Sequence, residues 1–329
     1  MMTHSEFCRS IEEQIRGELP AEYEHAMINL TRQVKHNDRE CTGICVRMPG
    51  ESIAPVIYLE SYFDQYESGM SMEGILHEVS EAVERSREMP VMDMNPKMLG
   101  DYSFVRDRLQ VRLFDTVKNE KRLEHMVHYC YGDLTAGYSI VLEQSREGTM
   151  AIPVTPELFA QWNISKKQLH EDALAADLAR EPKLCSLMDM TEAMFTGSTP
   201  ENYLDSSGKD LDPGMDMMVL TNGATSYGAA LIVNPRIQER IAEIVGGDFY
   251  VLPSSVHEVL ILPAVITDRI PVSALNEMVR TVNETEVSND DMLSDKVQYY
   301  ECASRMLVNA EAYEKAHEKT PSGEKNRTF

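Results

Sequence analysis

The chain has 329 residues, of which 43% are apolar and 26% are charged, a composition typical of a globular protein that buries a large core without disulfides or a structural metal. Its 54 acidic residues outnumber the 31 basic residues and give a formal net charge of −23. This balance disfavours direct binding to nucleic acid phosphates, which requires clustered Lys and Arg, and also disfavours docking on an anionic membrane.

The cysteines and the N-terminus indicate the compartment. Six cysteines are scattered along a chain that is far too long to be a small disulfide scaffold. The first residues are polar and lack the apolar core of a secretory signal, and no window approaches the roughly 18 apolar residues that span a bilayer. We therefore expect a cytoplasmic protein with no membrane partner.

Helical spacing dominates the beginning of the chain. Apolar positions across residues 5–34 predict two short helices separated at Pro20. Alternation and a Pro-Gly turn then predict strands at 44–46 and 56–59. An apolar stripe predicts a helix from Ser71 to about residue 83.

The middle of the chain has shorter elements. Apolar runs bounded by turn residues predict strands at 125–131, 137–143 and 150–154. Pro156 stands where a helix begins, and a second helix is predicted from about Ser165, its N-cap, to Leu178.

Residues 217–263 have the clearest pattern. They predict a hairpin that turns at Asn222-Gly223, a helix over 235–245 capped by Asn234, and a pair of strands. The expected strands lie at 218–221, 227–233, 249–252 and 256–262. A further helix is predicted at 271–282.

Hairpins followed by helices predict an α+β fold with largely antiparallel sheets and two subdomains. We expect an N-terminal helical segment at 1–40 and a first α+β subdomain at 41–195. The polar, turn-rich residues 196–216 are predicted to be a linker loop, followed by a second α+β subdomain at 217–307. Residues 308–329 have little apolar content and are predicted to be a disordered tail.

Ser255 and His257 are the candidate catalytic residues. If a strand begins before them, the two side chains share a face, so His257 could act as the base for a nucleophilic serine. No G-x-S-x-G motif surrounds the serine. The alternative interpretation is a serine that shapes a turn and a hydrogen-bonded histidine.

Cys41, Cys45, His128 and Cys130 are the candidate metal ligands. Thiolate and imidazole groups form tetrahedral zinc sites, and His128 and Cys130 would share one face of a strand. The spacings, however, match no standard zinc module.

Three acidic residues form a further candidate site. Asp290, Asp291 and Asp295 could bind a divalent ion, or one of the first two could cap a short helix. No phosphate-binding loop or dinucleotide motif is present, and His77-Glu78 lacks the second histidine of a zinc protease. We expect no cofactor, and the absence of motifs favours a protein that is not an enzyme.

The runs GDFYVLPSSVHEVLILP, TNGATSYGAALIVNP and NDDMLSDKVQYY resemble a family of bacterial proteins known only as domain of unknown function 5688. The resemblance covers most of residues 40–305 and is strongest in the C-terminal third. It implies a cytoplasmic bacterial protein of a type abundant in gut Firmicutes and their mobile elements. The family has no assigned catalytic residues, so the resemblance identifies no site.

Three functional hypotheses remain open. The leading one is a non-enzymatic protein that binds or regulates another protein of basic character, in a mobile-element or host-interaction setting. The second is an enzyme with a dispersed, motif-free site that is hydrolytic or metal-assisted. The third is an acidic mimic of DNA that inhibits a nucleic-acid-binding protein.

Overall fold

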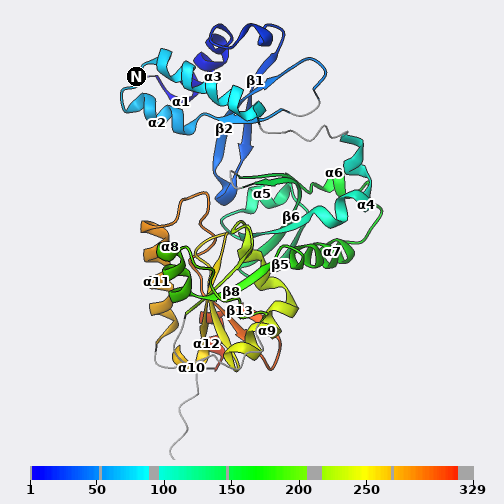
Figure 1. The fold of residues 1–329 in the computed structure, drawn as a ribbon, viewed down its shortest axis with the longest axis vertical. Coiled ribbons are helices and arrows are strands. Elements are labelled where there is room, and N and C mark those ends of the chain that lie inside the picture. The colour runs from blue at the N-terminus through cyan, green and yellow to red at the C-terminus, as the bar shows by residue number, and fades with distance from the viewer. Residues whose placement is uncertain are drawn as a thin grey trace, which may run out of the picture. The chain divides into compact units, whose positions relative to one another are not determined.

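The computed structural model describes residues 2–51, 54–88, 96–145, 148–205, 217–267 and 270–317 of the chain (Figure 1). Backbone contacts divide the chain into two compact units, Met1–Gly100 and Asp101–Phe329. Every strand pair within the described residues is antiparallel. The predicted α+β class with largely antiparallel sheets is therefore confirmed. Within the same residues, every helix is too short or too polar to cross a lipid bilayer.

The first unit is a small sheet with helices packed on it. The sheet has the strand order β1 (Met27–Val34), β2 (Glu40–Arg47) and β3 (Val56–Tyr58). The α-helices are α1 (His4–Gln14), α2 (Glu60–Glu67) and α3 (Met72–Glu88), and 3-10 turns form η1 (Ile15–Gly17), η2 (Ala21–Tyr23), η3 (His36–Asp38) and η4 (Pro96–Gly100). The predicted strands near 44–46 and 56–59 and the predicted helix after Ser71 are confirmed.

One apolar cluster holds the first unit together. Helix α1 begins at a capping box, in which the Thr3 hydroxyl accepts from the Glu6 N–H and the Glu6 carboxylate accepts from the Thr3 N–H. Each fully buried aliphatic side chain contributes about 1.5–3 kcal/mol to folding. The fully buried aliphatic residues of the cluster come from α1, η1, β2, α3 and the segment after β3: Ile11, Ile15, Ile44, Leu59, Ile75 and Val79.

The second short helix predicted within residues 5–34 is wrong. Residues 27–34 form β1, which pairs with β2 from Met27↔Arg47 to Val34↔Glu40. The prediction relied on Ala26, Leu30 and Val34, which are four residues apart. A spacing of four fits one face of a helix and equally fits one face of a strand, so only pairing with β2 decides between them.

The second unit contains two antiparallel sheets. One has the order β13-β12-β10-β11-β9-β8, and in the other β6 pairs with β4, β5 and β7. The strands are β4 (Leu109–Asp115), β5 (His128–Tyr131), β6 (Leu134–Ser145), β7 (Gly148–Pro153), β8 (Pro182–Ser186), β9 (Met218–Asn222), β10 (Phe249–Leu252), β11 (Val259–Pro263), β12 (Gln298–Glu301) and β13 (Met306–Asn309).

The helices of the second unit are short, apart from α7, α9 and α11. They are α4 (Tyr102–Val105), η5 (Arg106–Arg108), α5 (Glu120–Glu124), α6 (Pro156–Phe159), α7 (Lys166–Leu178), α8 (Leu187–Thr196), η6 (Gly228–Val233), α9 (Pro235–Val245), α10 (Ala264–Thr267), α11 (Val272–Thr285) and α12 (Ala310–His317).

Local capping confirms three predicted helix starts. The Thr155 hydroxyl accepts from the Leu158 N–H, and the Ser165 hydroxyl accepts from the Gln168 N–H. Asn234 caps α9 through the Arg236 N–H, with a proline in the first turn. These starts depend on residues within one helical turn, which is why the sequence alone predicts them.

The strand predicted at 227–233 is wrong, because these residues form the 3-10 helix η6. The preceding strand, β9, is already paired with β8 on one edge and β11 on the other, so no edge is left for a hairpin partner. The chain also passes very close to β9 at Gly228. A side-chain carbon there would lie 2.7 Å from both the Asn222 N atom and the His257 carbonyl oxygen.

The two compact units divide at Gly100 and Asp101, inside the predicted first subdomain 41–195, and the predicted N-terminal segment 1–40 belongs to the same unit as residues 41–100. Two further predicted boundaries also differ from the structure. The predicted linker at 196–216 lies within the second unit and joins β8 to its neighbour β9, although 206–216 lie outside the described residues. The tail predicted to be disordered from residue 308 instead forms the end of β13 and helix α12 as far as His317. The Tyr313 ring stacks on the Tyr299 ring with centroids 4.2 Å apart. This contact packs α12 against β12, although the segment has few apolar residues.

Helix α9 provides a test of this core. Ile241 is fully buried on its inner face. Replacing it by Asp should destabilise the protein by about 3 kcal/mol or more, because an unpaired carboxylate would replace a packed side chain. Denaturant unfolding measures the change. The exposed control Glu243→Asp should shift the free energy of unfolding by less than about 0.5 kcal/mol, and an Ile241→Asp protein as stable as this control would contradict the placement.

Candidate functional site

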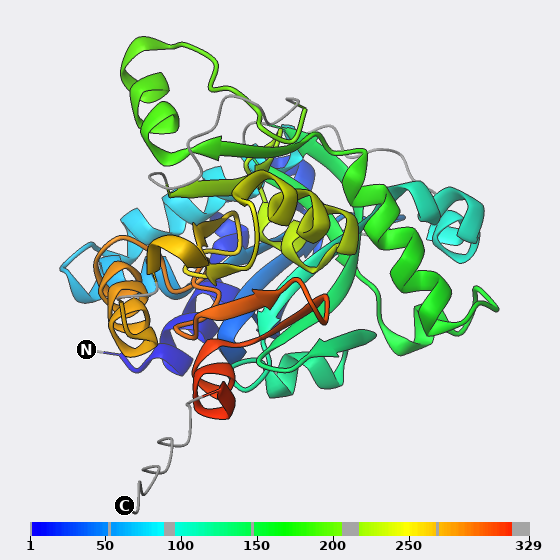
Figure 2. The ribbon, with the colours of Figure 1, turned by 90° about the horizontal axis from the view of Figure 1, so that it is seen from below.

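Helix α8 carries the largest concentration of exposed apolar side chains among the described residues. Met188, Met194 and Phe195 are 71%, 83% and 86% exposed, and Leu187 is 39% exposed. None of the ten residues of this helix is buried. In Figure 2 the helix projects away from the sheet beyond the end of β8. Contiguous exposed apolar surface of this kind makes the helix a candidate site of interaction with another molecule.

The exposed residues of α8 lie on one side of the helix. Leu187 and Met194 are seven residues apart, as are Met188 and Phe195, so each pair is separated by about two turns and points in nearly the same direction. The two rows are adjacent on the helix surface and form an apolar band, which we call the α8 face. This spacing is that of the anchors by which a helix occupies an apolar groove.

Local signals start and end α8. The Ser186 hydroxyl accepts from the N–H groups of Met188 and Asp189, and Gly197 ends the helix in a left-handed conformation with φ of 71°. The charged residues of the helix are both acidic, Asp189 and Glu192. A helix this short is marginal in water unless its apolar side is packed against another element.

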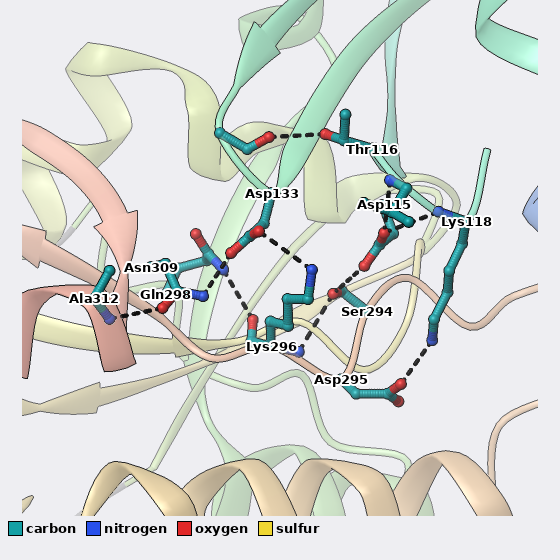
Figure 3. A network of polar contacts seen from close by, with 12 residues as sticks. Asp115, Thr116, Lys118, Asp133, Ser294, Asp295, Lys296, Gln298, Asn309 and Ala312 are labelled. Atoms are coloured by element: carbon teal, nitrogen blue, oxygen red, sulfur yellow. Dashed lines mark hydrogen bonds and ion pairs between the residues drawn. The ribbon is translucent and has the colours of Figure 1, made fainter. Parts of the chain in front are cut away.

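A second candidate, the polar cleft, lies where the chain approaches and leaves β12 (Figure 3). It is a cavity of about 340 Å³ with three cationic and four acidic side chains in its lining. The lining residues are Asp115, Lys118, Asp133, Asn276, Arg280, Asp295, Lys296, Asn309 and Glu311. They come from the end of β4 and the turn after it, the β5–β6 turn, α11, the residues before β12, the end of β13 and the start of α12.

Ion pairs within the chain satisfy the charges of the polar cleft. Lys118 Nζ donates to Asp295 Oδ2 at 2.7 Å, and Lys296 Nζ donates to Asp133 Oδ1 at 3.2 Å. Burial acts to raise the pKa of Asp295, but hydrogen bonds from Lys118 and Asn283 outweigh it and hold that pKa below its ordinary value. The carboxylate is therefore committed to its partners and is a poor candidate for acid–base chemistry.

A buried hydrogen bond forms the base of the polar cleft. The Ser294 hydroxyl donates to Asp115 Oδ2 at 2.7 Å, and both residues are buried. Asp115 Oδ1 also accepts from the N–H groups of Val117 and Lys118, which shapes the turn after β4. These contacts join the segment before β12 to the end of β4. The contacts around the cleft thus join the two sheets of the second unit.

A buried charge cluster lies elsewhere in the second unit. Arg112 stacks on the Tyr227 ring with its guanidinium carbon 3.1 Å from the centroid, and Asp177 Oδ2 accepts from the Val111 N–H at 3.0 Å. Burial raises the pKa of Asp177 to about 7, although Val111, Arg180 and Arg112 act in the opposite direction. Burial lowers the pKa of Arg112 to about 10, so this side chain stays charged near neutral pH.

The structure brings Ser255 and His257 together through the backbone. The Ser255 hydroxyl accepts from the His257 N–H at 3.0 Å. The His257 ring accepts from the Tyr227 N–H at Nδ1, so its proton is on Nε2, which donates to Asp291 Oδ1 at 3.1 Å. With both ring nitrogens engaged in this way, the imidazole has no position from which to take a proton from Ser255.

The four candidate metal ligands divide between the two units. Cys41 and Cys45 are on β2, where four residues of extended chain separate them by about 13 Å. His128 and Cys130 are on β5, and His128 Nδ1 donates to the carbonyl oxygens of Leu123 and Met126. Among the residues that the structure describes, no group of three or more His, Cys, Asp or Glu side chains is arranged to hold a metal ion.

The three acidic candidates also separate. Asp291 binds His257 and accepts from the Ser288 hydroxyl, whereas Asp295 pairs with Lys118 in the polar cleft. Asp291 and Asp295, at opposite ends of the loop before β12, therefore bind different partners and do not form one site.

Sequence reasoning missed the α8 face. The segment LMDMTEAMF does contain apolar residues at helical spacing, which is the available signal. The same spacing is usual for a helix that packs on a core, so exposure could be recognised only in the folded chain.

Comparison with known proteins gives one result. The model of a family of unknown function, DUF5688, matches residues 4–302. No curated protein and no solved structure matches the chain.

The buried base of the polar cleft gives a second prediction. Ser294→Ala should lower the free energy of unfolding by about 2 kcal/mol, because the buried Asp115 carboxylate loses a donor that water cannot replace. Urea titration measures the loss. The control Ser273→Ala, on the exposed side of α11, should change stability by less than about 0.5 kcal/mol. Equal effects of the two substitutions would contradict the structural role of the cleft.

The buried Asp177 gives a prediction about pH. Its folded-state pKa of about 7 exceeds its ordinary value of 3.8, so the folded chain holds this proton more tightly than the unfolded chain. The resulting stability is fully present below pH 3.8 and is lost as the pH rises to about 7.

Asp177→Asn removes this titration. The stability of the native protein relative to the variant should therefore fall by about 2–4 kcal/mol between pH 4 and pH 7. Denaturant unfolding at several pH values measures both proteins, and a difference that stays constant with pH would refute the prediction.

Proposed function

Since the chain belongs to the family of unknown function DUF5688, which assigns no activity, we propose its function from geometry: it is a non-enzymatic protein that binds another protein through the α8 face. The observation that carries the proposal is the exposure of Met188, Met194 and Phe195 on a helix that buries none of its residues. All six cysteines are free thiols, which supports a reducing, cytoplasmic setting.

The charge of α8 indicates the chemistry of the partner. Glu192 and Asp189 follow one edge of the α8 face, next to the row formed by Met188 and Phe195. A partner segment with apolar anchors and flanking Lys or Arg residues would cover the apolar band and neutralise this edge. We therefore assign the α8 face to a basic amphipathic helix of another protein.

A second copy of this chain fits the α8 face less well. Each copy carries a formal net charge of −23, so association of two copies brings like charges together. The acidic edge of α8 would also meet another acidic helix rather than a complementary one. Both effects favour a basic partner over self-association.

Peptide binding tests this function. A fluorescent amphipathic helix made of Leu and Lys should bind the full chain, whereas the same peptide with Glu in place of Lys should not. Replacing Met194 and Phe195 together by Ser should weaken binding at least about tenfold, because these side chains would anchor the peptide. The fold should be unaffected, because both side chains are exposed. Fluorescence anisotropy measures each affinity.

The matched control is Val117→Ser, since Val117 is also an exposed apolar residue but lies outside α8. This variant should bind the basic peptide with unchanged affinity. Equal affinity for the acidic and basic peptides, or no effect of the double substitution, would overturn the proposal. A stable dimer of the native chain that the double substitution dissolves would assign the α8 face to self-association instead.

A further inference from the structure

The first unit contains a cavity with a chemistry different from that of the α8 face. We call it the N-terminal cavity, and its volume is about 540 Å³, within the range of pockets that hold small molecules. It lies between the first half of α1 and the paired ends of β1 and β2. Its lining residues are His4, Ser5, Cys8, Arg9, Leu30, Arg32, Glu40, Cys41 and Thr42.

Two arginines of this lining have no partner among the described residues. The side chains of Arg9 on α1 and Arg32 on β1 form no hydrogen bond or ion pair with the described residues, and their charges act at longer range on Glu6 and Cys8. Elsewhere in the same unit, Arg87 forms a two-pronged pair with Glu51. In a chain with 54 acidic and 31 basic residues, two guanidinium groups at one cavity with no carboxylate bound to either are available to a ligand.

The fold fixes the backbone positions that carry the two arginines. Arg32 lies directly opposite Thr42 in the β1–β2 pair, so their side chains are on the same face of the sheet. Helix α1 is held against this sheet by the Glu12 carboxylate, which accepts from the Leu30 N–H at 3.0 Å. The positions of Arg9 and Arg32 therefore depend on a packed helix and a paired strand rather than on a loop.

Beside the arginines the cavity is lined by an uncharged thiol. Cys8 is buried, its sulfur lies 3.7 Å from His4 Nε2, and burial raises its pKa to about 11. The thiol therefore carries no negative charge near neutral pH. Ser5 and Thr42 add hydroxyl groups to the lining, and Glu40 is its one acidic residue. Glu60 reaches the same lining, but its Oε1 accepts from the Thr42 N–H and lies 3.8 Å from His4 Nε2. Arg9 and Arg32 therefore remain the charged groups available to a negatively charged occupant.

We propose that the N-terminal cavity binds a small molecule through a phosphate or carboxylate group held by Arg9 and Arg32. A guanidinium group presents its N–H donors as a planar fork that matches the paired oxygens of either anion. The hydroxyls of Ser5 and Thr42 supply further donors to the same ligand. This site is independent of the α8 face, because its residues all belong to the first unit.

Calorimetric titration of the full chain tests the site with two probes, inorganic phosphate and succinate, at low ionic strength. The native protein should bind at least one of them with a dissociation constant below about 1 mM. The double variant Arg9→Gln, Arg32→Gln should bind at least about tenfold more weakly, because both forks are lost. A preference for phosphate identifies a phosphorylated ligand, and a preference for succinate identifies a carboxylate ligand.

The matched control is Arg236→Gln, which removes one positive charge from an exposed position on α9 in the second unit. This variant should bind both anions as the native protein does, and circular dichroism should show all three proteins folded, since Arg9 and Arg32 are exposed. Failure of both anions to bind the native protein, or equal affinity in the double variant and the control, would overturn the proposal.

Discussion

The pairing of β9 on both edges is the constraint on which most of the second unit depends. Because β8 and β11 occupy its two edges, the chain that leaves β9 cannot form a hairpin and folds into η6 instead. That path brings Gly228 against the backbones of Asn222 and His257. It also places Tyr227 where its N–H binds the His257 ring and its own ring covers Arg112. These buried contacts of Tyr227 and Gly228 therefore follow from the pairing of β9 on both edges.

Helix α8, in contrast, is not required by this pairing. Neighbouring antiparallel strands such as β8 and β9 can be joined by a short turn. Here the connection instead extends over residues 187–217 and includes a helix that contributes nothing to the core. An excursion that is unnecessary for the sheet and exposes Met and Phe side chains supports the proposed role of the α8 face in binding. The acidic residues on α8 support the proposed basic partner.

Charge pairing explains how an acidic chain carries the polar contacts of the polar cleft. In the polar cleft, Lys118 and Lys296 each satisfy a carboxylate, and Ser294 satisfies the buried Asp115. The N-terminal cavity differs because the side chains of Arg9 and Arg32 form no ion pair among the described residues. The two proposed sites therefore differ in chemistry. The α8 face of the second unit presents exposed apolar side chains beside acidic residues, whereas the N-terminal cavity of the first unit presents unpaired positive charge.

The sequence by itself determined the features that depend on neighbouring residues. Ser165 and Asn234 begin their helices through bonds within one turn, and the α+β class follows from the alternation of strands and helices along the chain. Only the tertiary structure decided that residues 27–34 are a strand and that 227–233 are not, because these outcomes depend on whether a distant strand offers a free edge. Exposure of α8 and the gathering of Arg9 with Arg32 were likewise decided by folding, since spacing along a chain does not show what covers a side chain.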